Sequence, residues 1–286
     1  MSRFIRLFFT MKKIHEITSA ANPVIRLISA VVHTHRRAAK EGLFTVEGVR
    51  LAEMAAASDW HICHVLVTER AMAGERARVL VDMLIRQGTS AALVTEAIFE
   101  ELAETEHPQG ILLLMERRKT LLLEELQKKR AEDEQPLYVA LDRVQDPGNV
   151  GTILRTADAV GASGVILLRG SVDVYSGKVV RATMGSLFHV PFADNVSASA
   201  LMDFAQRAGL RFLATACDAD AEIHFSTDFR RGLIVVFGNE ANGVSEEILT
   251  VAQHVYIPMC GRAESLNVST TVTAVLYEAL RQRLYA

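Results

Sequence analysis

The chain has 286 residues, of which half are hydrophobic and 23% are charged, and its formal net charge is −3. This length suits about two domains, and this composition excludes a largely disordered chain. No stretch reaches the ~20 apolar residues that a membrane-spanning helix needs, and the three cysteines (Cys63, Cys217, Cys260) lack disulfide or zinc-ligand spacing, so we expect a cytoplasmic protein with reduced thiols.

The positive charge is concentrated in the first 40 residues. Eight basic residues face one acidic residue there, a balance of +7, which leaves −10 for the rest of the chain. Such a block can neutralise phosphates and steer a polyanion, with Arg26, Arg36 and Arg37 as candidate contacts. A solvated helix face is the alternative. Met11 also resembles a start, so residues 1–10 are expected to be an extension or a misassigned initiation site.

Residues 1–116 are predicted to form a small α/β domain. Asn22-Pro23 makes a turn, and apolar residues at helix spacing follow it at 24, 27, 28 and 31. The remaining predicted elements are strands at residues 44–46, 64–68, 92–94 and 111–115 and helices at residues 50–57 and 75–87. A charged segment at residues 117–136, helical in part, is expected to link this domain to the next.

Residues 137–286 alternate strand and helix patterns, which predicts a mostly parallel sheet covered by helices. Strands are expected at residues 138–141, 165–168, 211–216, 233–237 and 254–257, and helices at residues 150–160, 177–184, 198–208 and 268–284. Neither dinucleotide nor P-loop glycine patterns occur, which argues against nicotinamide chemistry and nucleotide hydrolysis.

Three strand-to-turn junctions in this domain carry polar side chains: residues 146–151 leading to Arg155, residues 237–240, and residues 265–269. Because ligands of parallel sheets bind at the carboxyl ends of strands, the junctions predict one cofactor site with a reactive polar wall. Ile257, Met259 and Leu266 suit an apolar pocket for an adenine or a thioether. Each junction alone also fits an ordinary loop, for example with Ser245 capping a helix.

The first junction is predicted to begin a helix with Asn149 as its cap after a tight turn at residues 146–148. At 100° per residue, Ile153, Leu154 and Ala157 fall on an apolar side, whereas Arg155 falls on the opposite, polar side. Arg155 is therefore expected to leave the core and face a ligand. The alternative for Arg155 is a surface ion pair with Asp158.

The three junctions together resemble the signature motifs of the SpoU (TrmH-like) RNA ribose 2'-O-methyltransferases of the SPOUT superfamily. The similarity runs from about residue 137 to 284 and keeps the order of the motifs, and residues 22–23, 44–48 and 109–111 resemble the substrate-binding domain of that family. The resemblance implies a deep trefoil knot in the C-terminal domain, bound S-adenosylmethionine, a homodimer and an RNA substrate, with ribosomal RNA expected before transfer RNA.

The functional residues of the family fall on Arg155, Asn149, Glu240, Ser265 and Asn267. The cofactor loops fall near Thr215, Gly238, Ile257, Met259 and Leu266, and Arg181 is expected to contact RNA phosphate.

Methyl transfer to a hydroxyl is an in-line displacement that needs no metal, but the ribose 2'-hydroxyl must lose its proton. We expect Arg155 near that oxygen, either as a base or as a group that orients the ribose and stabilises the alkoxide; a guanidinium is ordinarily a poor proton acceptor. Asn267 and Ser265 are expected to fix Arg155 or the ribose. A base-modifying enzyme of the superfamily and a non-catalytic RNA-binding protein are the alternatives.

Overall fold

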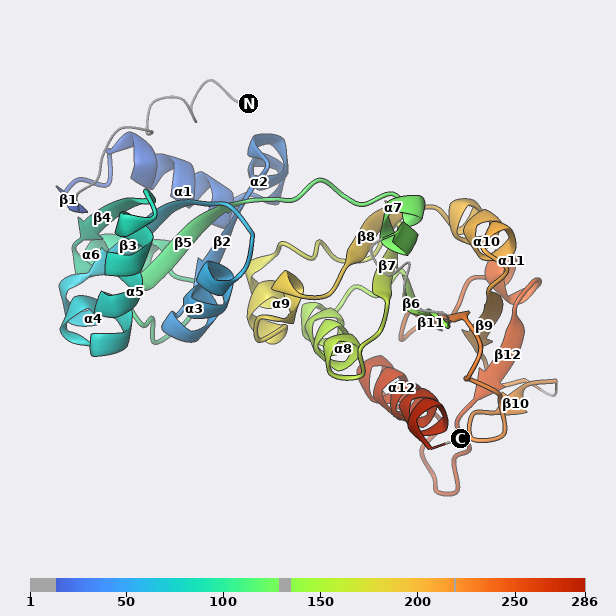
Figure 1. The fold of residues 1–286 in the computed structure, drawn as a ribbon. Coiled ribbons are helices and arrows are strands. Elements are labelled where there is room, and N and C mark those ends of the chain that lie inside the picture. The colour runs from blue at the N-terminus through green and yellow to red at the C-terminus, as the bar shows by residue number, and fades with distance from the viewer. Residues whose placement is uncertain (1–13, 129–134, 219, 286) are drawn as a thin grey trace. The chain divides into compact units, whose positions relative to one another are not determined.

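The computed structural model describes residues 14–128, 135–218 and 220–285, and these residues form two compact units (Figure 1). The first unit contains the chain up to Arg118 together with Tyr175–Arg181, and the second contains Lys119–Val174 and the chain from Ala182 onward. The predicted N-terminal extension, four of the eight basic residues of the first 40, and residues 129–134 of the expected linker lie outside the described residues.

The first unit is the small α/β domain that the sequence predicts. Its elements are β1 (Ile14–Ile17), α1 (Pro23–His33), α2 (His35–Glu41), β2 (Leu43–Glu47), α3 (Val49–Ala57), β3 (Ile62–Thr68), α4 (Glu69–Ala73), α5 (Glu75–Arg86), β4 (Ser90–Val94), α6 (Glu96–Leu102) and β5 (Ile111–Glu116). The strands form one sheet in the order β1-β4-β3-β5-β2, in which β5 runs antiparallel to both of its neighbours.

Helix α1 illustrates how the sequence sets an element of this unit. The side chain of Asn22 accepts a hydrogen bond from the backbone N–H of Val24 at 2.9 Å, and Pro23 occupies the first helical position, where no N–H is needed. The predicted apolar positions then turn inward, since Val24, Ile28 and Val31 are buried against the sheet. The short edge strand β1 and helices α2, α4 and α6 were not among the predicted elements.

The second unit is built on a seven-stranded sheet. Its elements are α7 (Leu123–Lys128), β6 (Leu137–Asp142), α8 (Pro147–Ala159), β7 (Gly164–Leu168), the 3-10 turn η2 (Ser186–Phe188), β8 (Phe192–Val196), α10 (Ala198–Arg207), β9 (Arg211–Thr215), β10 (Glu222–Ile223), β11 (Leu233–Gly238), α11 (Glu246–Leu249), β12 (Gln253–Tyr256) and α12 (Val268–Leu284). Helix α9 (Gly177–Ala182) follows β7 in the chain but belongs mostly to the first unit.

The strand order is β10-β12-β9-β11-β6-β7-β8, and every described pair in this sheet is parallel. From β6 the chain moves outward through β7 to β8, and it then returns to build β9, β11 and β12 on the other side of β6. The sheet therefore reverses its direction of winding between β6 and β11. Parallel α/β sheets open a ligand crevice at such a reversal.

Helices cover the sheet on both sides. Tyr138 and Ala140 of β6 and Ile234 and Val236 of β11 belong to a core cluster with Leu201 and Phe204 of α10. Helices α8 and α12 pack against each other, as Figure 1 shows. Because strand side chains alternate between faces, a strand buried on both sides reads as a continuous apolar run, which is why β6 and β11 were recognised from sequence.

The structure differs from the prediction in two segments, residues 123–128 and residues 177–184. Residues 123–128, which the sequence assigns to a linker, form α7, and Leu123 and Leu126 are buried in the core of the second unit. The helix expected at residues 177–184 ends at Ala182, because Met184 and Gly185 adopt positive φ angles of 50° and 99°. Strands β8 and β10 were not predicted, since their sequences lack an apolar run.

Candidate active site

The three polar junctions follow strands that stand close together in the sheet. Strands β6, β11, β9 and β12 are consecutive neighbours and parallel, so their carboxyl ends lie along one edge. Residues 143–149 follow β6, residues 239–245 follow β11, and residues 257–267 connect β12 to α12. The prediction that the junctions meet at the carboxyl edge is confirmed, and the reversal of winding falls between β6 and β11, the strands that precede the first two junctions.

Helix α8 begins differently from the prediction. Its N-cap is Asp146, whose Oδ1 accepts a hydrogen bond from the backbone N–H of Asn149 at 2.7 Å, and Pro147 is the first helical residue. The expected tight turn at residues 146–148 is therefore the first helical turn, and the assignment of Asn149 as the cap was wrong. Aspartate is among the preferred N-cap residues, and proline is pre-organised for the position that follows it.

The consequence is that the side chain of Asn149 is available for other contacts. Its Nδ2 donates to Oε1 of Glu240 at 2.5 Å, and its Oδ1 accepts a hydrogen bond from Nδ2 of Asn267 at 3.0 Å. One residue from each of the three junctions thus belongs to a single chain of hydrogen bonds. We call Glu240, Asn149 and Asn267 the amide relay.

The direction of the amide relay follows from its two ends. An ionised Glu240 carboxylate only accepts, so Asn149 must present its NH₂ group to it and its carbonyl oxygen to Asn267. At the other end, Oδ1 of Asn267 accepts from the backbone N–H of Ser269 at 2.9 Å and from Ser269 Oγ at 2.6 Å. A backbone N–H only donates, so both amide orientations are fixed independently. Asn267 is also the N-cap of α12.

The loop that carries Glu240 is held by Asn239. Its Oδ1 accepts from the backbone N–H groups of Ala241 at 2.9 Å and Asn242 at 3.3 Å, and its Nδ2 donates to the carbonyl oxygen of Arg143 at 2.9 Å. The last of these bonds ties the loop after β11 to the loop after β6. It therefore fixes these two loops relative to each other.

Gly238 is required by this loop itself. A Cβ atom at Gly238 would lie 2.0 Å from the carbonyl carbon of Gly243 and 2.1 Å from the backbone nitrogen of Val244. Residues 239 and 243 close the turn through two backbone hydrogen bonds of 3.1 and 2.8 Å. The missing side chain of Gly238 thus allows a close approach to the protein's own backbone.

A buried aspartate supports the same region. Asp142, the last residue of β6, is 3% exposed, and its Oδ2 accepts from the backbone N–H of Ser245 at 2.6 Å. Its Oδ1 pairs with Nε of Arg143 at 3.0 Å. Ser245 is the N-cap residue of α11 as the sequence alternative expected, although its side chain makes no capping hydrogen bond.

Arg155 lies on α8, nearly two helical turns beyond Asn149 of the amide relay. The predicted division of the helix is confirmed, since Ile153, Leu154 and Ala157 are buried and Arg155 is exposed. Arg155 forms no hydrogen bond or ion pair with any other residue that the structure describes. The alternative ion pair with Asp158 is not formed, because that carboxylate instead lies 3.5 Å from Nδ1 of His189.

Ser265 and Asn267 do not hold Arg155. Asn267 bonds to Asn149, and Ser265 is exposed without a hydrogen bond to other described residues. Of the two partners expected for these residues, Arg155 or the ribose, the structure shows no bond from Asn267 to Arg155, and contact with the ribose stays a prediction. The structural reason is that the capping geometry of α12 points the amide of Asn267 along the sheet edge toward α8.

The candidate cofactor residues occupy the same edge. Ile257 is half-buried, whereas Met259 and Leu266 are 37% and 38% exposed, so the loop after β12 presents apolar surface to solvent. Every residue from 259 to 267 is exposed. Thr215, the last residue of β9, is already engaged, since its Oγ1 donates to the carbonyl oxygen of Val236 at 3.3 Å.

The candidate RNA contacts divide into two pairs. Arg26 and Arg36 are exposed and have no ion-pair partner among the described residues. Arg37 pairs with Glu41 at 3.0 Å. Arg181 donates from Nη1 to Oε2 of Glu104 at 2.8 Å and keeps only 23% of its side chain exposed, so a carboxylate already occupies part of its guanidinium.

Asp142 was not among the predicted site residues, and Asp146 and Asn239 stood in the predicted junctions without an assigned role. The Asp-Pro pair was a usable signal, because a capping residue followed directly by proline is typical of a helix start. An asparagine at a strand-to-turn junction was a weaker one. Nothing local marks Asp142, whose partner lies about 100 residues away.

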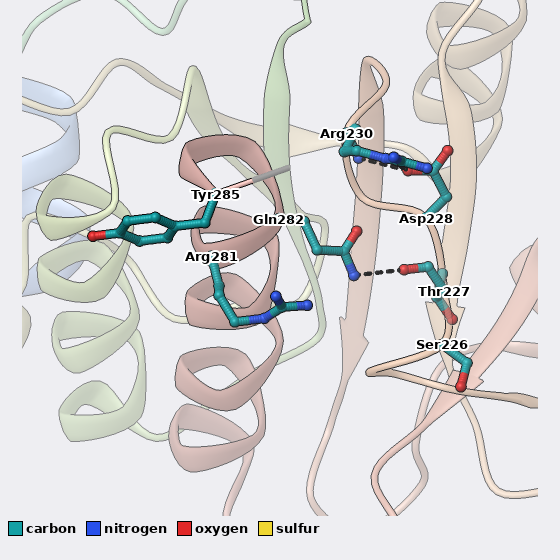
Figure 2. Close-up of a pocket in the computed structure, with 7 residues that line it drawn as sticks. All are labelled: Ser226, Thr227, Asp228, Arg230, Arg281, Gln282 and Tyr285. Carbon is teal, nitrogen blue, oxygen red and sulfur yellow. Dashed lines mark hydrogen bonds and ion pairs between the residues drawn. The ribbon is translucent and has the colours of Figure 1, made fainter.

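A pocket of about 260 Å³ lies elsewhere in the second unit, between residues 226–230 and the end of α12 (Figure 2). Its arginines are already paired, Arg230 with Asp228 at 2.8 Å and Arg281 with Glu278 at 2.7 Å. None of the predicted site residues lines it. The pocket is therefore separate from the candidate site at the carboxyl edge.

The fold and the site define a class: a parallel α/β protein with a ligand site at a winding reversal and a polar side-chain relay across it. Comparison with known proteins then identifies the group. The profile of the SpoU rRNA Methylase family matches residues 136–277, and that of the MRM3-like substrate binding domain matches residues 22–113.

Two curated relatives match over almost the whole chain. A Synechocystis protein named as an uncharacterized tRNA/rRNA methyltransferase is 35% identical, with 94% of this chain and 95% of the relative covered. The 23S rRNA (guanosine(2553)-2'-O)-methyltransferase RlmP of Bacillus subtilis is 31% identical, with 92% of this chain and 98% of the relative covered.

A solved structure agrees with them. The AdoMet-bound rRNA methyltransferase of Sinorhizobium meliloti superposes with a TM-score of 0.82 at 31% identity, with 96% and 99% of the two chains covered. This chain belongs to the SpoU rRNA Methylase family, and the resemblance drawn from the three motifs is confirmed. Among the described residues, no helix is both long and apolar enough to cross a bilayer.

Proposed function

We propose that this chain transfers a methyl group from S-adenosylmethionine to a ribose 2'-hydroxyl of RNA, with ribosomal RNA as the substrate and transfer RNA as the alternative. The observation that carries the proposal is the amide relay, which joins Glu240, Asn149 and Asn267 from the three junctions at the carboxyl edge. Ribosomal RNA is favoured because the Bacillus subtilis relative is named as a 23S rRNA methyltransferase and the Sinorhizobium structure as an rRNA methyltransferase.

The residues at the carboxyl edge fit the cofactor. Ile257, Met259 and Leu266 present partly exposed apolar side chains there, which suit the adenine ring and the thioether chain. The exposed loop at residues 259–267 offers backbone donors and acceptors for the adenine edge. When bound, S-adenosylmethionine supplies an activated methyl group on a positively charged sulfur.

The amide relay would serve as a rigid polar wall for the ribose. Each asparagine NH₂ group has two hydrogens, and only one on each is used within the relay, so one N–H of Asn149 and one of Asn267 remain available to ribose oxygens. Because both amides are already oriented, little reorganisation accompanies substrate binding. Glu240 sets the direction of the relay rather than taking the ribose proton.

Arg155 is proposed to approach the 2'-oxygen when RNA is bound. Its guanidinium has no partner among the described residues, so binding to substrate breaks no ion pair. A cation beside that oxygen favours loss of the hydroxyl proton to solvent or to an RNA phosphate and stabilises the developing alkoxide. Ser265, also exposed and without a partner among the described residues, is proposed to contact the ribose from the opposite junction.

The remaining expectations form part of the same proposal. Residues 1–116 would bind RNA, with Arg26 and Arg36 as phosphate contacts because they are exposed and unpaired among the described residues, and residues 137–286 would carry the methyltransferase reaction. Arg37 and Arg181 would contribute only after exchanging their carboxylate partners for phosphate. A trefoil knot, a homodimer, a reaction without metal and a cytoplasmic location complete the proposal.

The test is methylation of defined RNA by the purified protein. Ribosomal RNA and transfer RNA from cells that lack this protein are incubated with it and with S-adenosylmethionine, and the RNA is digested to nucleosides for mass spectrometry. The proposal predicts a ribose-methylated nucleoside from ribosomal RNA. A base-methylated product would overturn the ribose assignment, and methylation confined to transfer RNA would overturn the substrate.

Calorimetry separates the catalytic from the non-catalytic alternative. A protein that binds RNA but shows no heat of binding with S-adenosylmethionine at millimolar concentration would be a binding module. A protein that binds the cofactor while Arg155→Ala abolishes methylation supports the proposed chemistry.

A further inference from the structure

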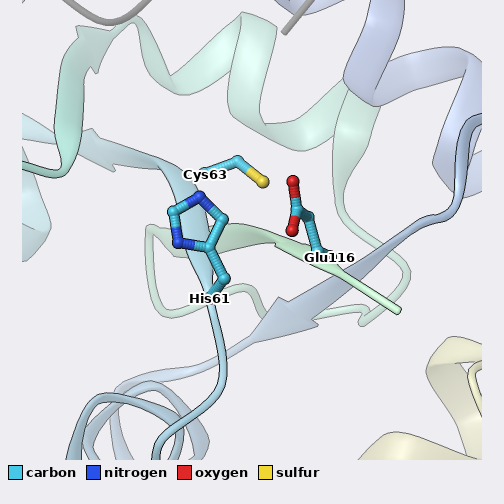
Figure 3. Close-up of side chains that lie close together, drawn as sticks. All are labelled: His61, Cys63 and Glu116. Atoms are coloured by element: carbon cyan, nitrogen blue, oxygen red, sulfur yellow. The ribbon is translucent and has the colours of Figure 1, made fainter. Parts of the chain in front are cut away.

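A second cluster of reactive side chains lies in the first unit, outside the candidate active site. His61 immediately precedes β3, Cys63 lies within β3, and Glu116 is the last residue of β5 (Figure 3). One ligand atom from each residue, an imidazole nitrogen, the thiol sulfur and a carboxylate oxygen, lies within 4.8 Å of the other two. The proposed methyl transfer does not use any of them.

The sheet brings these residues together through a bulge. Strands β3 and β5 are antiparallel, and Ile62 pairs with Met115 while His64 pairs with Leu114, so Cys63 is an extra residue in β3. A bulge re-aims the side chain that it adds. The backbone N–H of Glu116 donates to the carbonyl oxygen of His61 at 3.1 Å, which fixes the third residue beside the other two.

The separations suit a small transition-metal ion. Zinc binds sulfur at about 2.3 Å and nitrogen or oxygen at about 2.0–2.2 Å, so ligand atoms around a tetrahedral zinc lie roughly 3.4–3.6 Å apart. Rotation of three side chains at the end of two strands can shorten the present separations by about 1 Å. No hydrogen bond or ion pair with a described residue holds any of the three side chains in another position.

We propose that His61, Cys63 and Glu116 form a metal site for an ion of the Zn²⁺ class, with water as the fourth ligand. The donor set selects the ion: a thiolate and an imidazole favour zinc and its neighbours over Mg²⁺ or Ca²⁺, which take oxygen ligands. His61 is exposed while Cys63 and Glu116 are half-buried, so the ion can enter from solvent.

Binding replaces a proton by the metal. Cysteine binds an ion of this class as a thiolate, so the Cys63 thiol must lose its proton when the ion binds. When the sulfur coordinates the ion, the S–H bond breaks, the metal–sulfur bond forms, and the proton passes to solvent. No oxidant or reductant takes part.

The site would join β3 to β5 at the end of the sheet. Its ligands come from two strands that are adjacent in the sheet but far apart in sequence, so a bound ion restrains the ends of both. With three protein ligands, the ion would retain an exchangeable position, unlike a closed structural site of four.

Cobalt titration of the full-length, tag-free and metal-free protein tests the site, because Co²⁺ replaces Zn²⁺ and a Co²⁺–thiolate bond produces a charge-transfer absorption band. Cys217 and Cys260 are exposed free thiols, so the titration uses the variant Cys217→Ser/Cys260→Ser, in which Cys63 is the remaining cysteine. The expected result is a thiolate band that saturates at one Co²⁺ per chain and is removed by Zn²⁺.

Single variants then assign the ligands. Cys63→Ser, made in the otherwise unchanged chain, is expected to lose the thiolate band. His61→Ala and Glu116→Gln are each expected to weaken Co²⁺ binding more than tenfold in competition with a chromophoric chelator. His107→Ala and Glu106→Gln, at exposed positions of the same unit, are the matched controls and are expected to bind as the parent does. Circular dichroism without metal checks that each variant is folded.

The proposal is overturned if the Cys63-only variant shows no thiolate band, or if its band does not saturate at one Co²⁺ per chain. Should Cys63→Ser fail to fold, His61→Ala and Glu116→Gln decide the matter, since their side chains are exposed and half-buried, respectively. Unchanged Co²⁺ affinity in both would exclude the three-ligand site. None of these results depends on methyltransferase activity.

Discussion

Exchanging the amide of Asn149 and the carboxylate of Glu240 between the two positions tests the amide relay. Asn149→Asp puts a carboxylate where an NH₂ group donates to Glu240 Oε1 at 2.5 Å. Glu240→Gln instead removes the carboxylate that orients Asn149. In the double variant, the introduced glutamine donates to the introduced aspartate, and that aspartate still accepts from Asn267, so the relay forms again with the charge on the other residue.

The expected loss of methyl-transfer rate follows from the hydrogen bond between Asn149 and Glu240. Two carboxylates about 3 Å apart repel by about 1.4 kcal/mol in water and by about 5.5 kcal/mol at an effective dielectric constant of ~20. Because Glu240 is exposed, the lower value applies and the side chains turn apart, which breaks the relay at little cost in folding stability. A hydrogen bond to a charged group contributes about 1.5–3 kcal/mol, so each single variant is expected to lower the methyl-transfer rate roughly 10- to 100-fold.

Single-turnover methylation of ribosomal RNA at saturating cofactor measures the four proteins of this cycle. We expect the double variant to be about 5- to 150-fold faster than the product of the two single effects predicts, which corresponds to a coupling of about 1–3 kcal/mol. Cofactor affinity, measured by calorimetry, is expected to stay within a few-fold of the parent. A double variant whose loss equals the product of the single losses would refute the relay.

Three other perturbations probe separate parts of the second unit. Arg155→Ala is expected to slow methyl transfer more than 100-fold in the single-turnover assay without changing the melting temperature, because the side chain is exposed and has no partner among the described residues. Arg155→Lys tests whether the planar guanidinium group is needed. A near-normal rate would show that only the positive charge of the residue matters. Gly238→Ala places a Cβ 2.0 Å from the backbone of Gly243 and is expected to cost about 1–3 kcal/mol, or several degrees in melting temperature. His254 is expected to stabilise the fold most at low pH: its Nδ1 faces Asp218 at 2.6 Å and its Nε2 faces the Leu249 carbonyl at 2.8 Å, so only the protonated ring donates to both.

Two of these predictions have matched controls. Gly261→Ala adds a Cβ with no atom within 4 Å, so its melting temperature should equal that of the parent, and an equal loss in both glycine variants would contradict the steric argument. For the histidine, the Leu249 carbonyl and then Asp218 raise the pKa of His254 above 6.5 in the folded state. Its contribution is therefore complete below about pH 6.5 and lost as the pH rises through the folded value. The difference in melting temperature between the parent and His254→Asn should decrease as the pH rises from about 6.5 through the folded pKa of His254. A difference that stays constant with pH would exclude the linkage.

Local patterns were enough to predict most of the elements and the three junctions. Continuous apolar runs predicted β6 and β11, and helix periodicity predicted the buried face of α8 and the exposure of Arg155. Elements without such a signal were missed: β8 lacks an apolar run, and β10 has two residues. Leu123 and Leu126 stood in a charged segment whose composition indicated a linker, although both leucines are buried.

Local sequence patterns were sufficient to predict which polar groups stand at the carboxyl ends of the strands, since spacing along the chain places a residue on a strand, a turn or the first turn of a helix. The tertiary structure decided which groups bond to one another. Asn149 meets Glu240 and Asn267 because β6 lies beside β11 in the sheet, and Cys63 meets Glu116 because a bulge adds a residue to β3. Local periodicity reports only the neighbours within a few residues, whereas these contacts depend on the order and register of strands that are distant in the chain.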